Sequence, residues 1–225
     1  SVSIVGAVSP PSNDFSEPVT QQTKRYVRCF WALDKSLASA RHFPSVNWLN
    51  SYSEYTNEVI DWGKAAGHPD WQQLRSRALE LLQRESQLQQ IVKLVGPDAL
   101  PDDQRLVLET ARILRDGFLQ QSAFDPVDAY ATIGKQMQLL RTILLFHTRA
   151  ARIIAKGCPI GVLHELPIVT TLVRMKTTIA TEALDRYEAL VTVPGYQWHH
   201  GVVVPARHPL ARAEPLTLEA SAAHP

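Results

Sequence analysis

Three aromatic residues stand beside helix-breaking positions, where a loop can direct a side chain inward. Phe43 precedes a proline, and Phe124 and Tyr130 flank the Asp125-Pro126 dipeptide. Because an aromatic face can stack on a purine ring, these residues are candidates for a flat apolar slot that holds a base. The alternative is that the same rings pack between a sheet and a helical bundle. Composition alone does not favour the slot over this packing role.

A long loop over residues 9–20 (SPPSNDFSEPVT) is the second candidate for function. Its three prolines and its Asn, Asp and Ser residues resist both helix and sheet ladder. A proline-rich loop of this kind can be a rigid linker. Long ordered loops are otherwise often functional, so both interpretations stay open at this point.

Several common kinds of site are excluded or disfavoured within these 225 residues. The sequence contains no GxxxxGK[ST], HExxH, GxSxG or paired CxxC motif. Its two cysteines are too few for a disulfide framework or a four-thiolate zinc site. His147 is expected to be a satisfied core histidine, and Cys29 a small buried hydrophobe. The adjacent His199 and His200 side chains diverge, which disfavours a shared metal ion.

The overall composition excludes two classes of partner. Lys and Arg number 23 against 22 Asp and Glu, so the net charge of +1 gives no basic footprint for nucleic acid. No apolar run approaches the about 20 residues of a membrane span. Hydrophobic residues make up 45% and charged residues 20%, which is typical of a globular protein.

The elements that would position the candidates change in type along the chain. The first third predicts strands at residues 2–8 and 26–33 and a short helix over 34–43 that stops before a proline. A chain that opens inside a buried strand is expected to have lost what preceded it. From about residue 70 a helical period takes over. The final stretch, 193–225, holds five prolines and is expected to be a mobile tail.

Four helices are predicted after residue 70. They cover about 71–95, ended by Gly96-Pro97; 101–118, with two aspartates in its first turn; 135–156; and 168–190. The residues expected on their inward faces are Trp71, Leu74, Ala78, Leu81, Leu88, Ile91 and Val95, then Leu108, Ala111, Leu114 and Phe118, then Met137, Leu140, Leu144, Ala151 and Ile154, then Leu172, Met175, Ile179 and Tyr187. The residues thus predict the edge of an α/β sheet followed by an antiparallel helical bundle, an α+β chain overall.

Four segments in order resemble a known family: IVGAVSPPSNDFSEPVT, RHFPSVNWLNSYS, IVKLVGPDALPDDQR and FLQQSAFDPVDAY. They are similar to the catalytic A subunit, or alpha chain, of the V/A-type rotary ATPases, and most of all to archaeal and bacterial A-type enzymes. The resemblance covers residues 1 to about 190 and falls on the C-terminal portion of that subunit. It implies a remnant of the nucleotide-binding domain over 1–66, a helical bundle over 67–190 and a divergent tail over 191–225.

The resemblance assigns an adenine-binding role to the aromatic candidates. In the related F-type β subunit, an aromatic residue before Pro-Ala and an F-x-x-A-x-x-F segment enclose the adenine ring. Here Phe43 precedes Pro44, and Phe124, Val127 and Tyr130 have the spacing of that segment. These residues would position the nucleotide without performing chemistry.

The resemblance also implies two contacts with the central rotor. The segment 98–104 (DALPDDQ) resembles the acidic lever of the F-type β subunit, and DFSE resembles its rotor-touching loop. The residues concerned are Asp98, Leu100, Asp102 and Asp103 in the lever and Asp14, Phe15, Ser16 and Glu17 in the loop. The family usually has Gly-Gly where this chain has Ser12-Asn13, and glycine reaches φ/ψ regions that other residues rarely adopt.

The implied activity of the complete subunit is ATP hydrolysis or synthesis coupled to proton or sodium ion transport, the work of a translocase. The family's P-loop, catalytic glutamate and magnesium-side aspartate lie upstream, so no catalytic or metal residue is expected on this chain and it should be inactive alone. ATP or ADP and Mg²⁺ would bind the complete subunit. The expected partners are B subunits and central stalk rotor subunits, without nucleic acid or membrane insertion, on the cytoplasmic face of the cell membrane. The alternatives are a free-standing helical protein-interaction module or a degraded derivative without an ATPase role.

Overall fold

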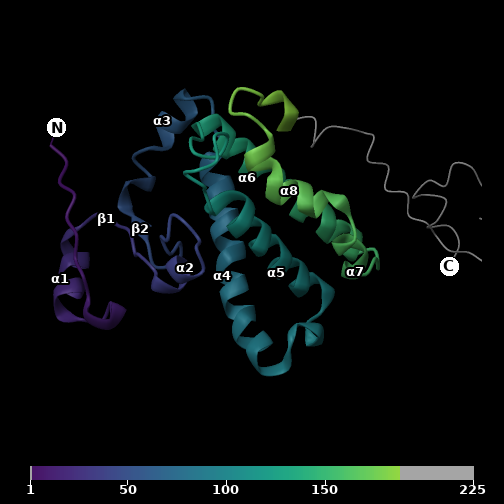
Figure 1. Ribbon diagram of the computed structural model, residues 1–225, viewed down its shortest axis with the longest axis horizontal. Helices are drawn as coiled ribbons and strands as arrows, with labels where there is room; N and C mark the ends of the chain where they lie inside the picture. Colours follow the sequence, from purple (N-terminus) through teal and green to yellow (C-terminus); the bar gives the residue numbers. More distant parts are fainter. Residues whose placement is uncertain (1, 188–225) are drawn as a thin grey trace, which may run out of the picture. The chain divides into compact units, whose positions relative to one another are not determined.

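The computed structural model describes residues 2–187 (Figure 1). Short helices and two very short strands come first, and longer helices follow from Trp71 onward. This order confirms the predicted α+β chain, with strands early and a helical bundle later. The predicted tail, including His199 and His200, lies outside the described residues.

The region before residue 66 is built from short elements. They are α1 (Pro18–Tyr26), β1 (Cys29–Phe30), α2 (Lys35–Ser39), β2 (Tyr52–Ser53) and α3 (Ile60–Ala65). The two strands pair antiparallel, with Phe30 opposite Tyr52. The predicted helix over 34–43 is confirmed in shortened form, because Asp34 caps α2 by accepting the Ser36 amide at 2.8 Å.

Two expectations for this region are wrong. Residues 2–8 form no strand, and Val2, Ile4 and Val5 are more than nine-tenths exposed. A strand needs a neighbour to satisfy its backbone, and no described strand pairs with this segment. The strand expected over 26–33 shrinks to β1, whose Cys29 is exposed rather than buried.

The proline-rich segment before α1 contains a left-handed residue. Ser12 has φ 53° and ψ 22° within a single 3₁₀ turn at Pro11–Asn13. This is the conformation that glycine adopts at low cost and other residues adopt rarely. The family's usual glycine at this place therefore has a conformational reason, which the chain meets with serine.

Five helices form the bundle, namely α4 (Trp71–Val95), α5 (Asp102–Leu114), α6 (Ile133–Ile154), α7 (Ile160–His164) and α8 (Pro167–Thr178). In the bundle α5 contacts each of the other four helices (Figure 1). Its side chains Ala111, Ile113 and Leu114 are completely buried. The core is therefore centred on α5, and the neighbouring helices are arranged around it.

The predicted helices are confirmed with two differences. The last one ends at Thr178 instead of continuing to residue 190, and Ile179 is already extended. Three consecutive β-branched residues, Thr177 to Ile179, disfavour continuation because their side chains lose χ1 freedom in a helix. In α4 the inward face is buried at Leu74 and Leu81, whereas Ile91 and Val95 are 46% and 58% exposed. A helical period identifies an apolar face but does not show whether a neighbour covers it.

Candidate functional site

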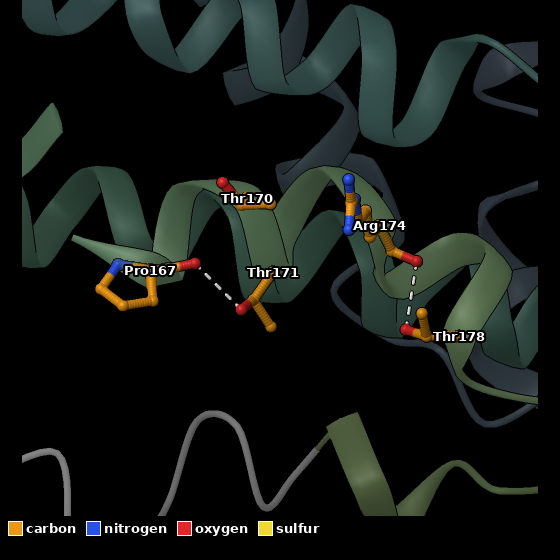
Figure 2. A pocket seen from close by; sticks show the side chains of 5 residues that line it. All are labelled: Pro167, Thr170, Thr171, Arg174 and Thr178. Carbon is orange, nitrogen blue, oxygen red and sulfur yellow. Dashed lines mark hydrogen bonds between the residues drawn. The ribbon is translucent and has the colours of Figure 1, made fainter. Parts of the chain in front are cut away.

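A shallow pocket of about 420 Å³ lies along α8 (Figure 2) and is lined by Pro167, Thr170, Thr171, Arg174 and Thr178. Two of its hydroxyls are used within the helix, since Thr171 donates to the Pro167 carbonyl at 3.0 Å and Thr178 to that of Arg174 at 3.1 Å. Hydroxyls bonded back to their own helix are not directed at a ligand. None of these residues is a site candidate from the sequence.

The aromatic candidates lie on the surface and not in the core. Phe43 is 52% exposed, Phe124 100% and Tyr130 73%, while Val127 is half-buried. The alternative interpretation, that these rings pack between sheet and bundle, is therefore wrong. Exposed rings on loops remain available to a ligand or to another part of a larger protein.

The backbone brings the two aromatic segments together. The Gln121 amide donates to the Phe43 carbonyl at 2.7 Å, three residues before Phe124. The rings do not stack on one another, because no ring-to-ring contact among residues 2–187 joins Phe43, Phe124 or Tyr130. The closed adenine slot around these residues stays a prediction.

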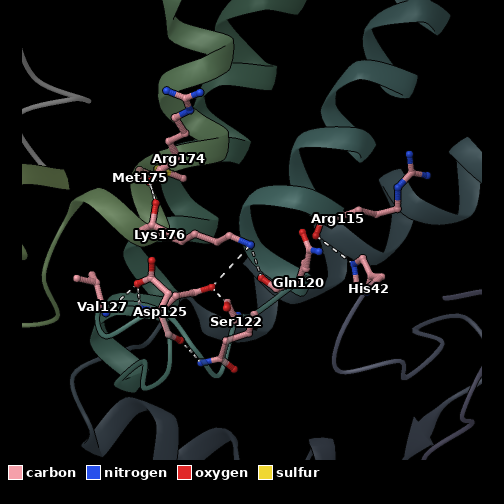
Figure 3. Close-up of polar contacts among 12 residues, drawn as sticks. His42, Arg115, Gln120, Ser122, Asp125, Val127, Arg174, Met175 and Lys176 are labelled. Carbon is pink, nitrogen blue, oxygen red and sulfur yellow. Dashed lines mark hydrogen bonds and ion pairs between the residues drawn. The ribbon is translucent and has the colours of Figure 1, made fainter. Parts of the chain in front are cut away.

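Residues 41–43 make two further contacts with the end of α5. The Gln120 amide group donates to the Arg41 carbonyl at 3.3 Å, and His42 Nε2 lies 3.3 Å from the Arg115 carbonyl (Figure 3). A carbonyl only accepts, so Nε2 carries the proton and Nδ1 is a buried acceptor without a partner. The His42 ring also lies 5.7 Å from the Trp48 ring. These contacts fix the segment that carries Phe43 against the bundle.

The loop that carries Phe124 and Tyr130 is folded by two aspartates. Asp125 accepts the Val127 amide at 2.8 Å and the Asp128 amide at 3.0 Å, which closes a turn. Asp128 is buried and accepts the Ser122 amide at 2.8 Å. The loop backbone is therefore ordered from within, although its aromatic side chains point to solvent.

Two buried lysines hold this loop from the bundle side. Lys135 of α6 is completely buried, and its Nζ donates to the Val127 carbonyl at 2.8 Å and to the Lys176 carbonyl at 2.9 Å. Lys176 of α8 donates to the Gln120 carbonyl at 2.7 Å and lies 3.8 Å from the Asp128 carboxylate (Figure 3). Burial lowers the pKa of both ammonium groups, and the Asp128 charge opposes this shift.

A π-helical turn delivers the chain from α5 into the loop. It covers Arg115–Leu119 and is closed by the Gln120 amide, which donates to the Arg115 carbonyl at 2.8 Å. Gly117 lies against α8 so closely that a Cβ atom there would be 3.0 Å from the Leu172 carbonyl oxygen. The Arg115 guanidinium forms an ion pair with Glu85, a residue that is 5% exposed.

The predicted lever forms the turn between α4 and α5. Gly96 ends α4 with φ 84° and ψ 159°, and a 3₁₀ turn follows at Pro97–Ala99. Leu100 is 7% exposed, so it anchors the turn from inside and is not presented on its surface. Asp98 and Asp103 are exposed, while Asp102 accepts the Ile160 amide at 3.1 Å and so caps α7.

The DFSE segment also has local structural roles. Asp14 accepts the Ser16 hydroxyl at 2.6 Å, and Glu17 caps α1 by accepting the Thr20 amide at 2.9 Å. These hydrogen bonds lower the pKa of each carboxylate, that of Asp14 mainly through the Ser16 hydroxyl. The Phe15 ring meets Phe30 edge to face at 6.1 Å. The exposed carboxylates remain free to face a partner.

The remaining candidates show no catalytic arrangement. His147 Nδ1 lies 2.9 Å from the Thr110 hydroxyl, and burial lowers its pKa, which confirms a satisfied core histidine. Within residues 2–187 no group of three or more His, Cys, Asp or Glu side chains could hold a metal ion. In the same part of the chain, no helix is long and apolar enough to cross a membrane.

Comparison with known proteins identifies two matching family models. The C-terminal domain of V and A type ATP synthase matches residues 60–161, and the nucleotide-binding domain of the ATP synthase alpha/beta family matches residues 1–53. The V-type ATP synthase alpha chain of Halothermothrix orenii is 53% identical over 191 residues, which are 85% of this chain and 32% of that protein. In the A-type ATP synthase of Methanopyrus kandleri, the corresponding protein is 50% identical over 190 residues, or 84% and 32%.

The chain thus spans about a third of the length of these curated relatives. Among solved structures, an ATP synthase subunit from Nanoarcheaum equitans matches with a TM-score of 0.52 at 20% sequence identity. The match covers 61% of this chain and 34% of the other. At this identity the likeness concerns the fold alone.

Proposed function

The chain is a homologue of the C-terminal portion of the catalytic alpha chain of V-type and A-type ATP synthases, and from this premise we propose that it supplies adenine contacts and a rotor-facing helical tip to such a subunit. The parent reaction is ATP hydrolysis or synthesis coupled to ion transport. The homology favours this function over a free-standing interaction module. The proposed division is a nucleotide-binding remnant over 1–66 and a helical domain over 67–190.

The adenine contacts are assigned to Phe43, Phe124, Val127 and Tyr130. The observation that carries the proposal is the hydrogen bond from the Gln121 amide to the Phe43 carbonyl, which brings the two predicted segments together. Both segments present exposed aromatic rings from an ordered backbone. A purine needs apolar cover on its faces, and these side chains offer it.

Phosphate and Mg²⁺ chemistry is assigned to other parts of the complete subunit. The described residues hold no cluster that could bind a metal ion, so they do not fit a Mg²⁺ site and no step is derived through one. Phosphoryl transfer depends on such ligands. The part of the reaction that this chain can influence is the binding and orientation of the base.

The rotor contact is assigned to the turn between α4 and α5 and to the DFSE segment. Asp98, Asp103, Asp14 and Ser16 are exposed there. The proposed partners are B subunits and central stalk rotor subunits, in a complex on the cytoplasmic face of the membrane. Closure of the adenine contacts would move the bundle as a unit, and the tip would pass that motion to the rotor.

Substitution of Tyr130 tests the adenine assignment. In a complete catalytic subunit that carries these residues, Tyr130→Ala should raise the Michaelis constant for ATP about tenfold, because stacking is worth about 1–3 kcal/mol per base. The maximal rate should stay the same, since ground state and transition state lose the same contact. Steady-state ATP turnover measures both quantities.

Tyr26→Ala is the matched control, because Tyr26 is an exposed tyrosine at the end of α1. It should change neither constant. An unchanged Michaelis constant in Tyr130→Ala, or an equal change in the control, would refute the assignment.

A further inference from the structure

We propose that Lys135 and Lys176 are positioning residues for the adenine-facing loop, in that their two ammonium groups set the backbone from which Phe124, Val127 and Tyr130 project. The inference rests on the proposed function for its meaning in nucleotide binding, but its structural part stands on this chain alone. Neither lysine touches the proposed nucleotide side chains through its own side chain. Each acts through a carbonyl of the loop.

The first argument is that the exposed rings cannot anchor the loop. Phe124 is 100% exposed and Tyr130 73% exposed, so neither gains position from packing against the bundle. Ordering such a loop carries an entropic cost of about 1–2 kcal/mol per residue. The contacts that offset this cost must therefore come from the backbone side of the loop.

The second argument is where the lysine contacts fall. Lys176 holds the Gln120 carbonyl, at the entrance to the loop, and Lys135 holds the Val127 carbonyl, between the two aromatic residues. Lys135 also donates to the Lys176 carbonyl, which ties α6 to α8 behind the loop. The Asp128 carboxylate, 3.8 Å from Lys176 Nζ, accepts the Ser122 amide and closes the network on the loop itself.

The third argument is energetic. Burying an ammonium group is unfavourable unless it is paired and hydrogen-bonded, and burial lowers the pKa of both lysines. A core that needed only filling would be served as well by an apolar side chain of similar volume. What an apolar side chain cannot do is donate to Val127 and Gln120. The lysines therefore provide direction to the loop rather than bulk to the core.

Amide hydrogen exchange on the 225-residue chain tests the structural part. In Lys176→Met, the amides of Ser122, Val127 and Asp128 should exchange at least about tenfold faster than in the unaltered chain. That ratio corresponds to about 1.4 kcal/mol, the scale of one hydrogen bond to a charged group. Core amides of α5 should change much less. Lys135→Met serves as the second variant, so that a failure of one variant to fold does not end the test.

Two controls separate positioning from general destabilisation. Lys156→Met removes an exposed lysine after α6 and should leave every amide unchanged. Ile143→Val removes one methylene from a fully buried site of α6 and should accelerate loop and core amides together. If both lysine variants leave the loop amides unchanged, or accelerate loop and core equally, the positioning role is overturned.

The functional part uses a complete catalytic subunit that carries the same substitutions. Both lysine variants should raise the Michaelis constant for ATP several-fold at an unchanged maximal rate, because the aromatic faces lose their orientation and no reacting group is altered. A loosened loop with an unchanged Michaelis constant would support positioning and refute the adenine role. An unchanged loop would refute positioning whatever the kinetics show, so the two proposals fail separately.

Discussion

The two ends of α5 are built on opposite principles. They are separated by roughly 27 Å, the length of the 18 residues from Asp102 to Leu119 at helical rise. At the loop end, Lys135, Lys176 and Glu85 are buried charged residues, each bonded to specific partners. At the tip end, Ile91, Leu94 and Val95 are exposed, and Arg105 pairs with an exposed Asp98.

The comparison teaches which end has its conformation fixed in advance. Breaking a buried ion pair is strongly destabilising, whereas exposed pairs contribute little. The loop end therefore has one energetically favoured arrangement before any ligand arrives. The tip end exposes apolar side chains and carboxylates at little cost, as a surface that meets a partner must. A binding site and a contact surface are thus held at opposite ends of one helix.

The largest expected difference comes from the two arginines. Arg115→Met removes the partner of the buried Glu85 and should lower the unfolding free energy by about 3 kcal/mol, because an uncompensated charge is left buried. Arg105→Met breaks pairs of 3.6 and 3.7 Å with Asp98 and Asp102 near the surface and should cost about 0.5 kcal/mol. Urea denaturation of both variants measures the difference. Equal losses would show that the two ends are not distinct.

Alkaline pH should weaken the loop end through Tyr187. Its side chain is completely buried, its hydroxyl donates to the Met175 carbonyl at 3.3 Å, and burial raises its pKa from 10.0 to about 12. Because the folded pKa is the higher one, its contribution is complete below pH 10 and is lost as the pH rises through about 12. The loss should be about 2–3 kcal/mol.

Comparison with Tyr187→Phe isolates this contribution from other groups that titrate in the same range. The variant lacks the hydroxyl and should lose less stability over that interval, as measured by urea denaturation at stepped pH. Tyr26→Phe, at an exposed position, should follow the unaltered chain. Parallel curves for all three proteins would contradict the burial argument.

The smallest effects, from two glycines, should reverse the order of the ends. Gly96 at the tip has φ 84° and open space around it, so Gly96→Ala should cost about 2 kcal/mol through backbone strain alone. Gly117 has no such φ but lies close to the Leu172 carbonyl. Gly117→Ala should cost about 1 kcal/mol or less, because the gain in helix propensity offsets part of the close contact.

Valine at each position sharpens the distinction between strain and space. Gly117→Val should be clearly worse than Gly117→Ala, since size is what the site excludes. Gly96→Val should differ little from Gly96→Ala, since the backbone conformation is what excludes both. Thermal or urea unfolding of the four variants gives the two series, and a size dependence at Gly96 would show that the tip is more tightly packed than its exposure indicates.

The sequence predicts the helices of the bundle because their ends are written in local chemistry. Gly96-Pro97 ends α4, and the aspartates after Pro101 begin α5. The burial of Lys135 and Lys176 could not be predicted in this way, because lysine is read as a surface residue unless its acceptors are known. Those acceptors are backbone carbonyls far away in the sequence, such as that of Gln120 for Lys176.

The same limit explains the errors in the first third. An apolar run such as residues 2–8 satisfies every local rule for a strand, but a strand also needs a neighbour, which no local pattern supplies. For the aromatic residues, the prolines beside them indicated loops and correctly placed Phe43 near the later segment. Whether the rings face solvent or core depends on what covers them, and three side chains say nothing of that.

The π-helical turn makes the direction of the adenine-facing loop a matter of counting. One residue more than an α-helical turn requires rotates everything that follows by about 100° around the helix axis. Removing a single residue between Arg115 and Leu119 would restore α-helical phase and swing the departure of the chain through that angle, away from Lys135 and Lys176. Substitutions in this turn can drift among relatives, but its length is a setting that gene duplication, recombination and protein engineering must preserve.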